Sequence, residues 1–331
     1  MNKKTALITG ITGQDGSYLA ELLVEKGYAV HGITRRIAME DPEHRMSRVR
    51  GLLDQIELHP ASMESYPSIF RVIQKVRPDE IYHLAALSYV GRSFDDEFST
   101  LNTNINGTHY VLAAFKEAVP ESRLYFAATS EMFGKVTDVP QKECTPFHPC
   151  SAYGISKLAG YELTRNYREG YQIHASSGIL FNHESPRRGF EFVTRKITSH
   201  AARIKLGLAR ELRLGNLEAR RDWGHAKDYV RAMWLMLQQD QPGDYVIATG
   251  QTRSVRDFAE MAFQRVALDY RDYVKVDPAF CRPGEADQLV GDATLARSKL
   301  GWRQEHSFEE LVCEMVDEDL RLFARGGAGA T

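Results

Sequence analysis

Apolar runs of strand length alternate with stretches of helical periodicity through the N-terminal half of the chain. The strand-like runs are residues 5–9, 28–34, 56–59, 80–85 and 123–129. Helix-like stretches lie between them, among them residues 14–26, 67–76 and 104–118. Because strands joined by helices pair in parallel, this pattern predicts an α/β fold built on a doubly wound parallel sheet.

Two later runs, 173–181 and 244–249, read as further strands of this sheet, with a segment rich in Arg, Gly and Pro between them. The second domain is therefore expected to be discontinuous. The predicted first domain comprises residues 1–181 plus about 225–250. A smaller α/β substrate-binding domain, about 182–225 plus 250–325, is expected at the carboxyl ends of the strands, where open sheets bind ligands. The glycine-rich end, 326–331, is predicted to be a flexible tail.

Composition and charge narrow the function classes. With 331 residues, of which 43% are hydrophobic, the chain is long enough to form a sizeable core. Its 42 basic and 44 acidic residues nearly cancel, so the total charge favours neither a nucleic acid nor an anionic membrane as partner. No apolar run approaches the ~20 residues of a membrane span. We therefore expect a soluble protein of the cytoplasm.

The four cysteines give no sign of a metal site or a disulfide framework. None of them forms a C-x-x-C pair, and free thiols are expected. Cys144, His148 and Cys150 do crowd one loop, but their spacing fits no common metal motif. The sequence therefore predicts no metal.

A glycine motif, Gly10-x-x-Gly13-x-x-Gly16, follows the first strand and precedes a helix. Glycines at this turn let the backbone approach a pyrophosphate, and the helix N-terminus stabilises its charge. Tight strand-to-helix turns use glycine in any case, but this context favours a Rossmann-type dinucleotide site. The first domain is thus predicted to bind a nicotinamide dinucleotide.

The end of the second strand selects the form of that dinucleotide. An acidic residue here would hold the ribose of NAD, whereas this chain has Arg35 and Arg36. Two guanidinium groups favour a 2′-phosphate and hence NADP. The alternative is a solvated basic loop, since Arg45, Arg48 and Arg50 follow closely.

The candidate chemistry lies in two short stretches. Tyr153 and Lys157 are one helical turn apart, so the ammonium is expected to lower the pKa of the phenol from ~10 towards neutrality. Tyr153 is then a candidate base beside a nicotinamide. Glu131 adds a second proton-transfer group, which suggests elimination after oxidation. The plainer alternatives are a surface Tyr–Lys pair and a glutamate that caps the following segment.

The motifs resemble those of GDP-mannose 4,6-dehydratases, which are extended short-chain dehydrogenase/reductases. The matching segments are GITGQDGSYL at 10–19, TSEMFG at 129–134, NHESPRRG at 182–189 and RDWGHAKDY at 221–229. The resemblance runs from about residue 4 to 320. It implies an NADP-dependent lyase of nucleotide-sugar metabolism and deoxysugar biosynthesis that forms a homodimer or homotetramer.

Carried over by position, the resemblance implies three sets of site residues. The catalytic set is Thr129, Glu131, Tyr153 and Lys157. The cofactor set is Gly10, Thr12, Gly13, Gln14, Asp15, Gly16, Arg35, Arg36, Ser62, Met63, Leu84, Ala85, Ala86, Ser88, Tyr153, Lys157, His183 and Arg188. The set for the GDP-sugar is Ser88, Ser130, Asn182, Lys196, Leu214, Gly215, Arg221, Arg282 and Glu285.

The implied reaction keeps NADP tightly bound and recycles it. Tyr153 takes the proton from the 4-hydroxyl while hydride leaves carbon 4 of GDP-D-mannose. Glu131 then removes the proton from carbon 5, water leaves from carbon 6, and the hydride returns to carbon 6. Thr129 holds the oxygen on carbon 4. The expected product is GDP-4-keto-6-deoxy-D-mannose.

Departures from the family pattern leave the sugar open. Ser62 stands where an aspartate commonly meets the adenine, and Leu87 replaces a glutamine near the sugar. Cys150 and Ala152 replace an arginine and a proline just before Tyr153. GDP-D-glycero-D-manno-heptose is therefore an alternative substrate. A GDP-sugar epimerase or 4-reductase is a further alternative, which Glu131 argues against, and a catalytically silent nucleotide sensor is a third.

Overall fold

A seven-stranded parallel sheet forms the centre of the molecule, in a computed structural model that describes residues 3–40, 46–135, 138–280 and 288–327. Its strand order is β10-β6-β5-β4-β1-β2-β3. The strands are β1 (Thr5–Thr9), β2 (Ala29–Thr34), β3 (Ile56–Pro60), β4 (Glu80–His83), β5 (Arg123–Thr129), β6 (His174–Leu180) and β10 (Asp244–Ile247). The strands predicted from the apolar runs are confirmed, with small differences at their ends.

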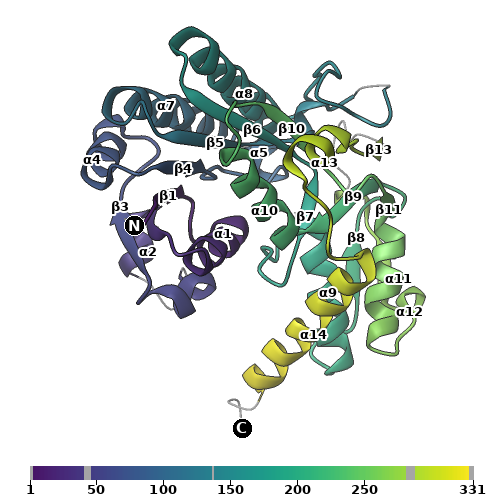
Figure 1. Cartoon of the computed structure of the whole chain (residues 1–331). Helices are drawn as coiled ribbons and strands as arrows, with labels where there is room; N and C mark the ends of the chain where they lie inside the picture. Colours follow the sequence, from purple (N-terminus) through teal and green to yellow (C-terminus); the bar gives the residue numbers. More distant parts are fainter. Residues whose placement is uncertain (1–2, 41–45, 136–137, 281–287, 328–331) are drawn as a thin grey trace.

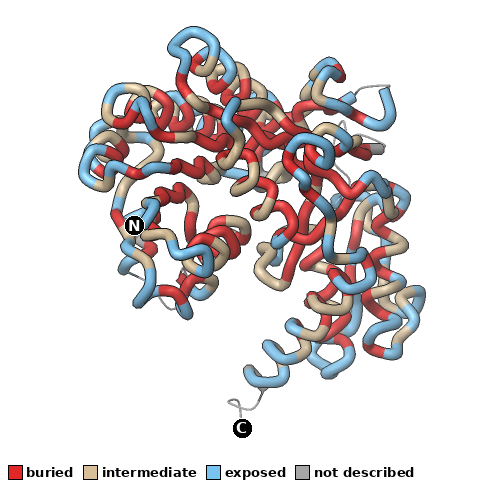
Figure 2. The backbone as a smooth tube through the Cα atoms, viewed as in Figure 1, coloured by how far each residue is buried: buried red, intermediate tan, exposed pale blue. Residues whose placement is uncertain are grey.

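Helices cover both faces of this sheet, which confirms the doubly wound arrangement (Figure 1). The helices on one face are α1 (Gln14–Glu25) and α10 (Ala226–Leu237). Those on the other face are α4 (Tyr66–Val76), α7 (Gly107–Ala118) and α8 (Ala152–Tyr171). The strands are buried on both faces and the exposed residues lie on the outer sides of the helices, as Figure 2 shows. Burial on both faces explains why the strands read as continuous apolar runs.

A second group of elements lies beyond the carboxyl ends of β5 and β6, with its own apolar core. Its small sheets are β11-β9-β13, with β7 beside β9, and β12-β8. The strands are β7 (Asn182–Glu184), β8 (Leu212–Leu214), β9 (Arg220–His225), β11 (Thr252–Ser254), β12 (Val274–Val276) and β13 (Gln288–Leu289). The helices that enclose this core are α9 (Val193–Lys205), α11 (Val255–Arg265) and α14 (Phe308–Gly327). The exact domain boundaries remain a prediction.

Short elements complete the chain. They are α2 (Arg36–Glu40), η1 (Ser47–Leu52), α5 (Arg92–Asp95), α6 (Glu97–Leu101), η2 (Asn102–Asn106), η3 (Ser130–Met132), α12 (Tyr270–Tyr273), η4 (Pro278–Phe280) and α13 (Thr294–Leu300). Helix α14 extends to Gly327, and residues 328–331 lie outside the described part, so the flexible tail at 326–331 stays a prediction. No helix in the described ranges is both long and apolar enough to cross a membrane.

Asp222 on β9 connects the two groups of elements. Its fully buried carboxylate accepts hydrogen bonds from the backbone amide and the hydroxyl of Thr249, at 2.9 and 2.7 Å. It also accepts from the amides of Gly250 and Gly291, at 2.9 and 3.3 Å. The two partner segments directly follow the strands β10 and β13. The Asp222 carboxylate therefore anchors the segments after β10 and β13 to β9, and so connects the second group of elements to the central sheet.

Asp222→Ala is expected to lower the free energy of unfolding by roughly 3–5 kcal/mol, because it leaves several buried donors without acceptors. Urea unfolding followed by circular dichroism measures this change. Asp240→Ala, at an exposed carboxylate, is the control and is expected to change stability by less than ~0.5 kcal/mol. A loss at Asp222 no larger than that of the control would contradict the anchoring role.

Candidate active site

A cavity of about 980 Å³ opens at the carboxyl ends of the central strands. It runs from the loop after β1, past the ends of β2, β4 and β5, to the second group of elements around β7 and β9. Strand order reverses between β1 and β4, and open α/β sheets bind their ligands at such a reversal. The cavity is therefore at the place where this topology predicts a site.

The glycine loop fits a dinucleotide pyrophosphate. Gly13 precedes α1 without a side-chain cap, so the first amides of this twelve-residue helix have no side-chain acceptor there. Gly16 has no room for a side chain, because an added Cβ would lie 2.3 Å from the carbonyl oxygen of Gly10. Both glycines line the cavity. The bare loop thus leaves space and unpaired donors for a phosphate group.

An ion pair fixes the first turn of α1 to β7. His183 Nε2 lies 2.8 Å from Asp15 Oδ2, while His183 Nδ1 donates to the carbonyl of Phe181 at 2.8 Å. The imidazole also stacks on Tyr229, with ring centroids 4.5 Å apart. Burial acts to lower the pKa of His183, but Asp15 outweighs it and leaves the pKa above 6.5. Burial likewise acts to raise the pKa of Asp15, but His183 and Arg188 outweigh it and leave the pKa below 3.8.

The pair makes stability depend on pH. The contribution of Asp15 is present above pH 3.8 and is lost as pH falls through its lower folded pKa. That of His183 is present below pH 6.5 and is lost as pH rises through its raised folded pKa. The coupling free energy from a double-mutant cycle of Asp15→Asn and His183→Gln is expected to be roughly 1.5–3 kcal/mol near pH 5.5 and smaller near pH 9. A cycle that gives the same energy at both pH values would contradict this assignment.

The four predicted catalytic residues meet on one wall of the cavity. Thr129 ends β5, and its hydroxyl accepts from the amide of Glu131 at 3.3 Å. Tyr153 and Lys157 come from the first turns of α8, and both are buried. Lys157 Nζ donates to the carbonyl of Ala127 at 2.7 Å and lies 6.0 Å from the centroid of the Tyr153 ring. The lysine is thus held beside the phenol by the backbone of β5.

Close packing brings α8 against Glu131. Ser151 caps the helix by accepting from the amide of Gly154 at 3.0 Å. A Cβ added at Gly154 would lie 2.7 Å from the carbonyl oxygen of Glu131, so only glycine permits this approach. Tyr153 precedes that glycine. The contact therefore sets the phenol next to the carboxylate.

Electrostatics at the phenol differ from the sequence-based prediction. Burial first, and then the charge of Glu131, raise the pKa of Tyr153 above its usual value, while Thr129 and Arg188 act in the opposite direction. The lowering of the phenol pKa expected from Lys157 is not found, because burial and Glu131 outweigh the groups that act to lower it. Burial also lowers the pKa of Lys157 itself, to about 8. The chain alone thus holds Tyr153 as the neutral phenol.

Two more polar residues belong to this region: Asn104, which sequence reasoning passed over, and Arg48, which it placed in a possible solvated loop. Asn104, in the π-helical turn η2, accepts from the amide of Leu87 at 2.8 Å and donates to the hydroxyl of Ser156 at 2.9 Å. It ties the loop after β4 to α8. Arg48 lines the cavity and donates to the carbonyls of Arg187 and Thr12, at 2.7 and 3.3 Å. Only tertiary structure reveals either role, since neither residue lies in a motif.

Most of the predicted site residues line the same cavity. They are Gly10, Thr12, Gly13, Gln14, Asp15, Gly16, Arg35, Ser62, Met63, Leu84, Ala85, Ala86, Ser88, Thr129, Glu131, Tyr153, Lys157, Asn182, His183, Arg188, Gly215 and Arg221. Residues that sequence reasoning missed on the wall include Asn216, Trp223, Phe192 and Phe280. Aromatic residues between charged ones give no distinct sequence signal.

Six predicted site residues are not on this wall or are not described. Arg36 points to solvent and pairs with Glu40 at 3.2 Å, because both lie on α2 four residues apart. The predicted substrate residues Ser130 and Leu214 are buried behind the wall, and Lys196 Nζ lies 3.7 Å from the ring centroid of the wall residue Phe280. Residues Arg282 and Glu285 lie outside the described residues.

Comparison with known proteins identifies relatives over nearly the whole chain. The family model described as GDP-mannose 4,6 dehydratase matches residues 7–315. The chain is 48% identical to the GDP-mannose 4,6-dehydratase of Sinorhizobium fredii, over 96% of this chain and 97% of that protein. It is 46% identical to the human GDP-mannose 4,6 dehydratase, over 97% of this chain and 92% of that protein.

Solved structures share the fold at lower identity. The dTDP-glucose 4,6-dehydratase of Streptomyces venezuelae superposes with a TM-score of 0.84 at 22% identity, over 98% of both chains. A UDP-glucose 4-epimerase of Thermotoga maritima also reaches 0.84, at 24% identity, over 96% of this chain and 99% of that one. At this identity the likeness concerns the fold alone.

Proposed function

Because this chain belongs to the GDP-mannose 4,6-dehydratase family, we propose that it converts GDP-D-mannose to GDP-4-keto-6-deoxy-D-mannose. One observation supports this most directly: Glu131 and Tyr153 line the same cavity as the glycine loop. An alcohol oxidation needs only the phenol, whereas a dehydration needs a second proton-transfer group beside it. Relatives that are 48% identical over nearly the whole chain are GDP-mannose 4,6-dehydratases, which favours mannose over the heptose alternative.

The cofactor is proposed to be NADP. Relatives of this fold are solved with NAD or with NADPH, so a nicotinamide dinucleotide is supported in general. Arg35 lines the cavity at the end of β2, where a 2′-phosphate would lie, and a guanidinium matches that group. When bound, the oxidised nicotinamide supplies the hydride acceptor and a positive charge that favours the anion of a neighbouring phenol.

Proton transfer at carbon 4 is assigned to Tyr153. Its phenol is buried, and Thr129 acts to lower the pKa of the phenol. Lys157, whose pKa of about 8 lies far below its usual value, is held by Ala127 and gives the anion of the phenol a nearby charge. The two groups therefore position and move the proton of the 4-hydroxyl.

Elimination is assigned to Glu131. Its carboxylate is half-buried at the cavity, and its charge raises the pKa of Tyr153, so the two groups disfavour being anionic together. Glu131 takes the proton from carbon 5 after the ketone forms at carbon 4. The same carboxyl group then gives that proton to the hydroxyl on carbon 6, which leaves as water.

The proposal is tested by incubating the purified chain, without added cofactor, with GDP-mannose and separately with GDP-D-glycero-D-manno-heptose. We expect GDP-mannose to lose one water and to give the alkali-induced absorbance of a 4-keto sugar. Turnover of the heptose alone would make the heptose the substrate. Leu87 would then be the first residue to test, because it lines the cavity and replaces a glutamine of the family pattern near the sugar. No turnover of either sugar, with NADP restored, would overturn the dehydratase in favour of an epimerase or reductase.

Two finer features are tested on the same preparation. The nucleotide released by denaturation is expected to have the mass of NADP rather than NAD. Light scattering after size-exclusion chromatography is expected to give a dimer or tetramer, and a monomer would contradict the proposed homo-oligomer.

A further inference from the structure

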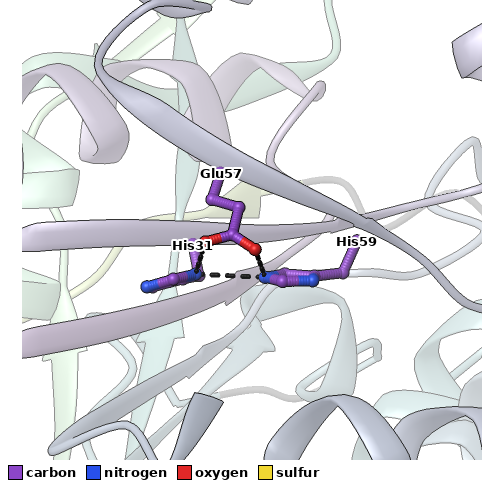
Figure 3. A group of neighbouring side chains, drawn as sticks. All are labelled: His31, Glu57 and His59. Atoms are coloured by element: carbon purple, nitrogen blue, oxygen red, sulfur yellow. Dashed lines mark hydrogen bonds and ion pairs between the residues drawn. The ribbon is translucent and has the colours of Figure 1, made fainter. Parts of the chain in front are cut away.

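A cluster of potential metal ligands lies at the edge of the central sheet, outside the sequence motifs that form the candidate active site. His31 is on β2, and Glu57 and His59 are on the edge strand β3 (Figure 3). In the parallel register His31 pairs with Glu57, and His59 is two residues further along β3. Because side chains two apart on a strand share a face, all three project to the same side of the sheet. That side is the one covered by α4, since Lys75 of α4 reaches Glu57 at 3.3 Å.

The three side chains point toward one another with distances suited to a metal ion. His31 Nδ1 lies 3.0 Å from His59 Nε2, and the Glu57 carboxylate oxygens lie 3.5 Å from His31 Nδ1 and 3.6 Å from His59 Nε2. Ligand atoms of a tetrahedral Zn²⁺ site, each ~2.0–2.1 Å from the ion, are ~3.3 Å apart. The observed separations bracket that value. A shift of a few tenths of an ångström therefore places an ion between all three groups.

The chemical state of the ligands also suits a cation. A neutral imidazole has one ring nitrogen with a free lone pair, which is the form that coordinates a metal ion. The two rings are stacked at 5.3 Å and share one proton between facing nitrogens. When the shared proton leaves and each ring carries its proton on the outer nitrogen, His31 Nε2 or His59 Nδ1, the lone pairs of both facing nitrogens are available to an ion. Lys75 competes for Glu57, but its side chain is 66% exposed and free to turn into solvent.

We propose that His31, Glu57 and His59 bind one divalent transition-metal ion of the Zn²⁺ class, with water completing the coordination. Two imidazoles and one carboxylate form a donor set that suits Zn²⁺ better than Mg²⁺ or Ca²⁺. The role is structural, because the ion joins the edge strand β3 to β2. Both strands end at the cavity, at Thr34 and Ala61, so the ion steadies the wall proposed to hold the adenosine end of the cofactor. This departs from the sequence-based prediction of no metal, since the ligands come from separate segments.

Zn²⁺ alone is the probe, added to protein stripped with a chelator and dialysed near pH 7.5. Isothermal titration calorimetry is expected to give one ion per chain, and Co²⁺ is expected to give the intense visible absorption of a tetrahedral site. The variants His31→Gln and Glu57→Gln are each expected to weaken binding at least ~10-fold. Thermal unfolding of the wild type is expected to shift upward with added Zn²⁺.

His109→Gln, which removes an exposed histidine on α7, is the matched control and is expected to bind Zn²⁺ as the wild type does. His59→Gln removes the buried ligand. If His59→Gln misfolds, Glu57→Gln still tests the site, because the Glu57 side chain is 56% exposed. Equal binding by the wild type and by both His31→Gln and Glu57→Gln would overturn the proposal. The proposal would also be overturned if the wild type did not bind one Zn²⁺ per chain. His31 and His59 would then form only the hydrogen bond seen between their rings.

Discussion

Glu131→Gln is expected to reduce the cofactor but to release no dehydrated product. The amide keeps the shape of the side chain and removes the base assigned to the proton on carbon 5. Tyr153 still takes the proton of the 4-hydroxyl as hydride leaves carbon 4 for the nicotinamide, so absorbance of reduced NADP should appear on mixing with GDP-mannose and persist. Steady-state turnover is expected to fall by ~10²–10⁴, the usual size of a general acid–base contribution. Stopped-flow absorbance and mass spectrometry of the sugar measure the two effects separately.

The matched control for this variant is Glu121→Gln. Glu121 is exposed and lies just before β5, at the opposite end of the strand from Glu131. Turnover by the control is expected to equal that of the wild type. Normal dehydration by Glu131→Gln would remove the carboxylate from the mechanism and leave the elimination to another group.

Tyr153→Phe is expected to stop the reaction one step earlier. Without the phenol hydroxyl, no group at this position takes the proton from the 4-hydroxyl of the sugar, so neither reduced NADP nor product should form. The expected loss of turnover is again ~10²–10⁴. The two variants are therefore told apart by the absorbance of the reduced cofactor, which only Glu131→Gln should show.

Tyr171→Phe is the control for the loss of a phenol from α8. Tyr171 ends the same helix and is 51% exposed, far along the chain from the capped first turn. Wild-type turnover is expected. If Tyr153→Phe still reduced NADP on mixing with substrate, the proton would have another acceptor and the assignment would be wrong.

Local signals made the central sheet and the glycine loop predictable. Strands buried on both faces give continuous apolar runs, and the turn at Gly16 leaves no room for a side chain. Tyr153 and Lys157 were also predictable as a pair, because helical spacing alone places them on one face. These features depend on residues near one another in the sequence.

Features that depend on packing between distant segments were not predictable. The pKa of Tyr153 rises because the chain buries it beside Glu131, an approach that depends on contact between α8 and the end of β5. Arg48, on η1 between β2 and β3 in the sequence, reaches the loop after β1. His31 and His59 become neighbours only through the register of β2 and β3. Sequence patterns report periodicity, but they do not report which strand lies next to which.

The most direct test of the proposed reaction follows a deuterium label from carbon 4 of GDP-mannose, with purified protein and no added cofactor. The account predicts a product one water lighter that carries the deuterium on carbon 6, because the hydride leaves and returns within one active site. A dehydrated product without the label on carbon 6, or recovery of unchanged GDP-mannose from protein that holds its NADP, would contradict it.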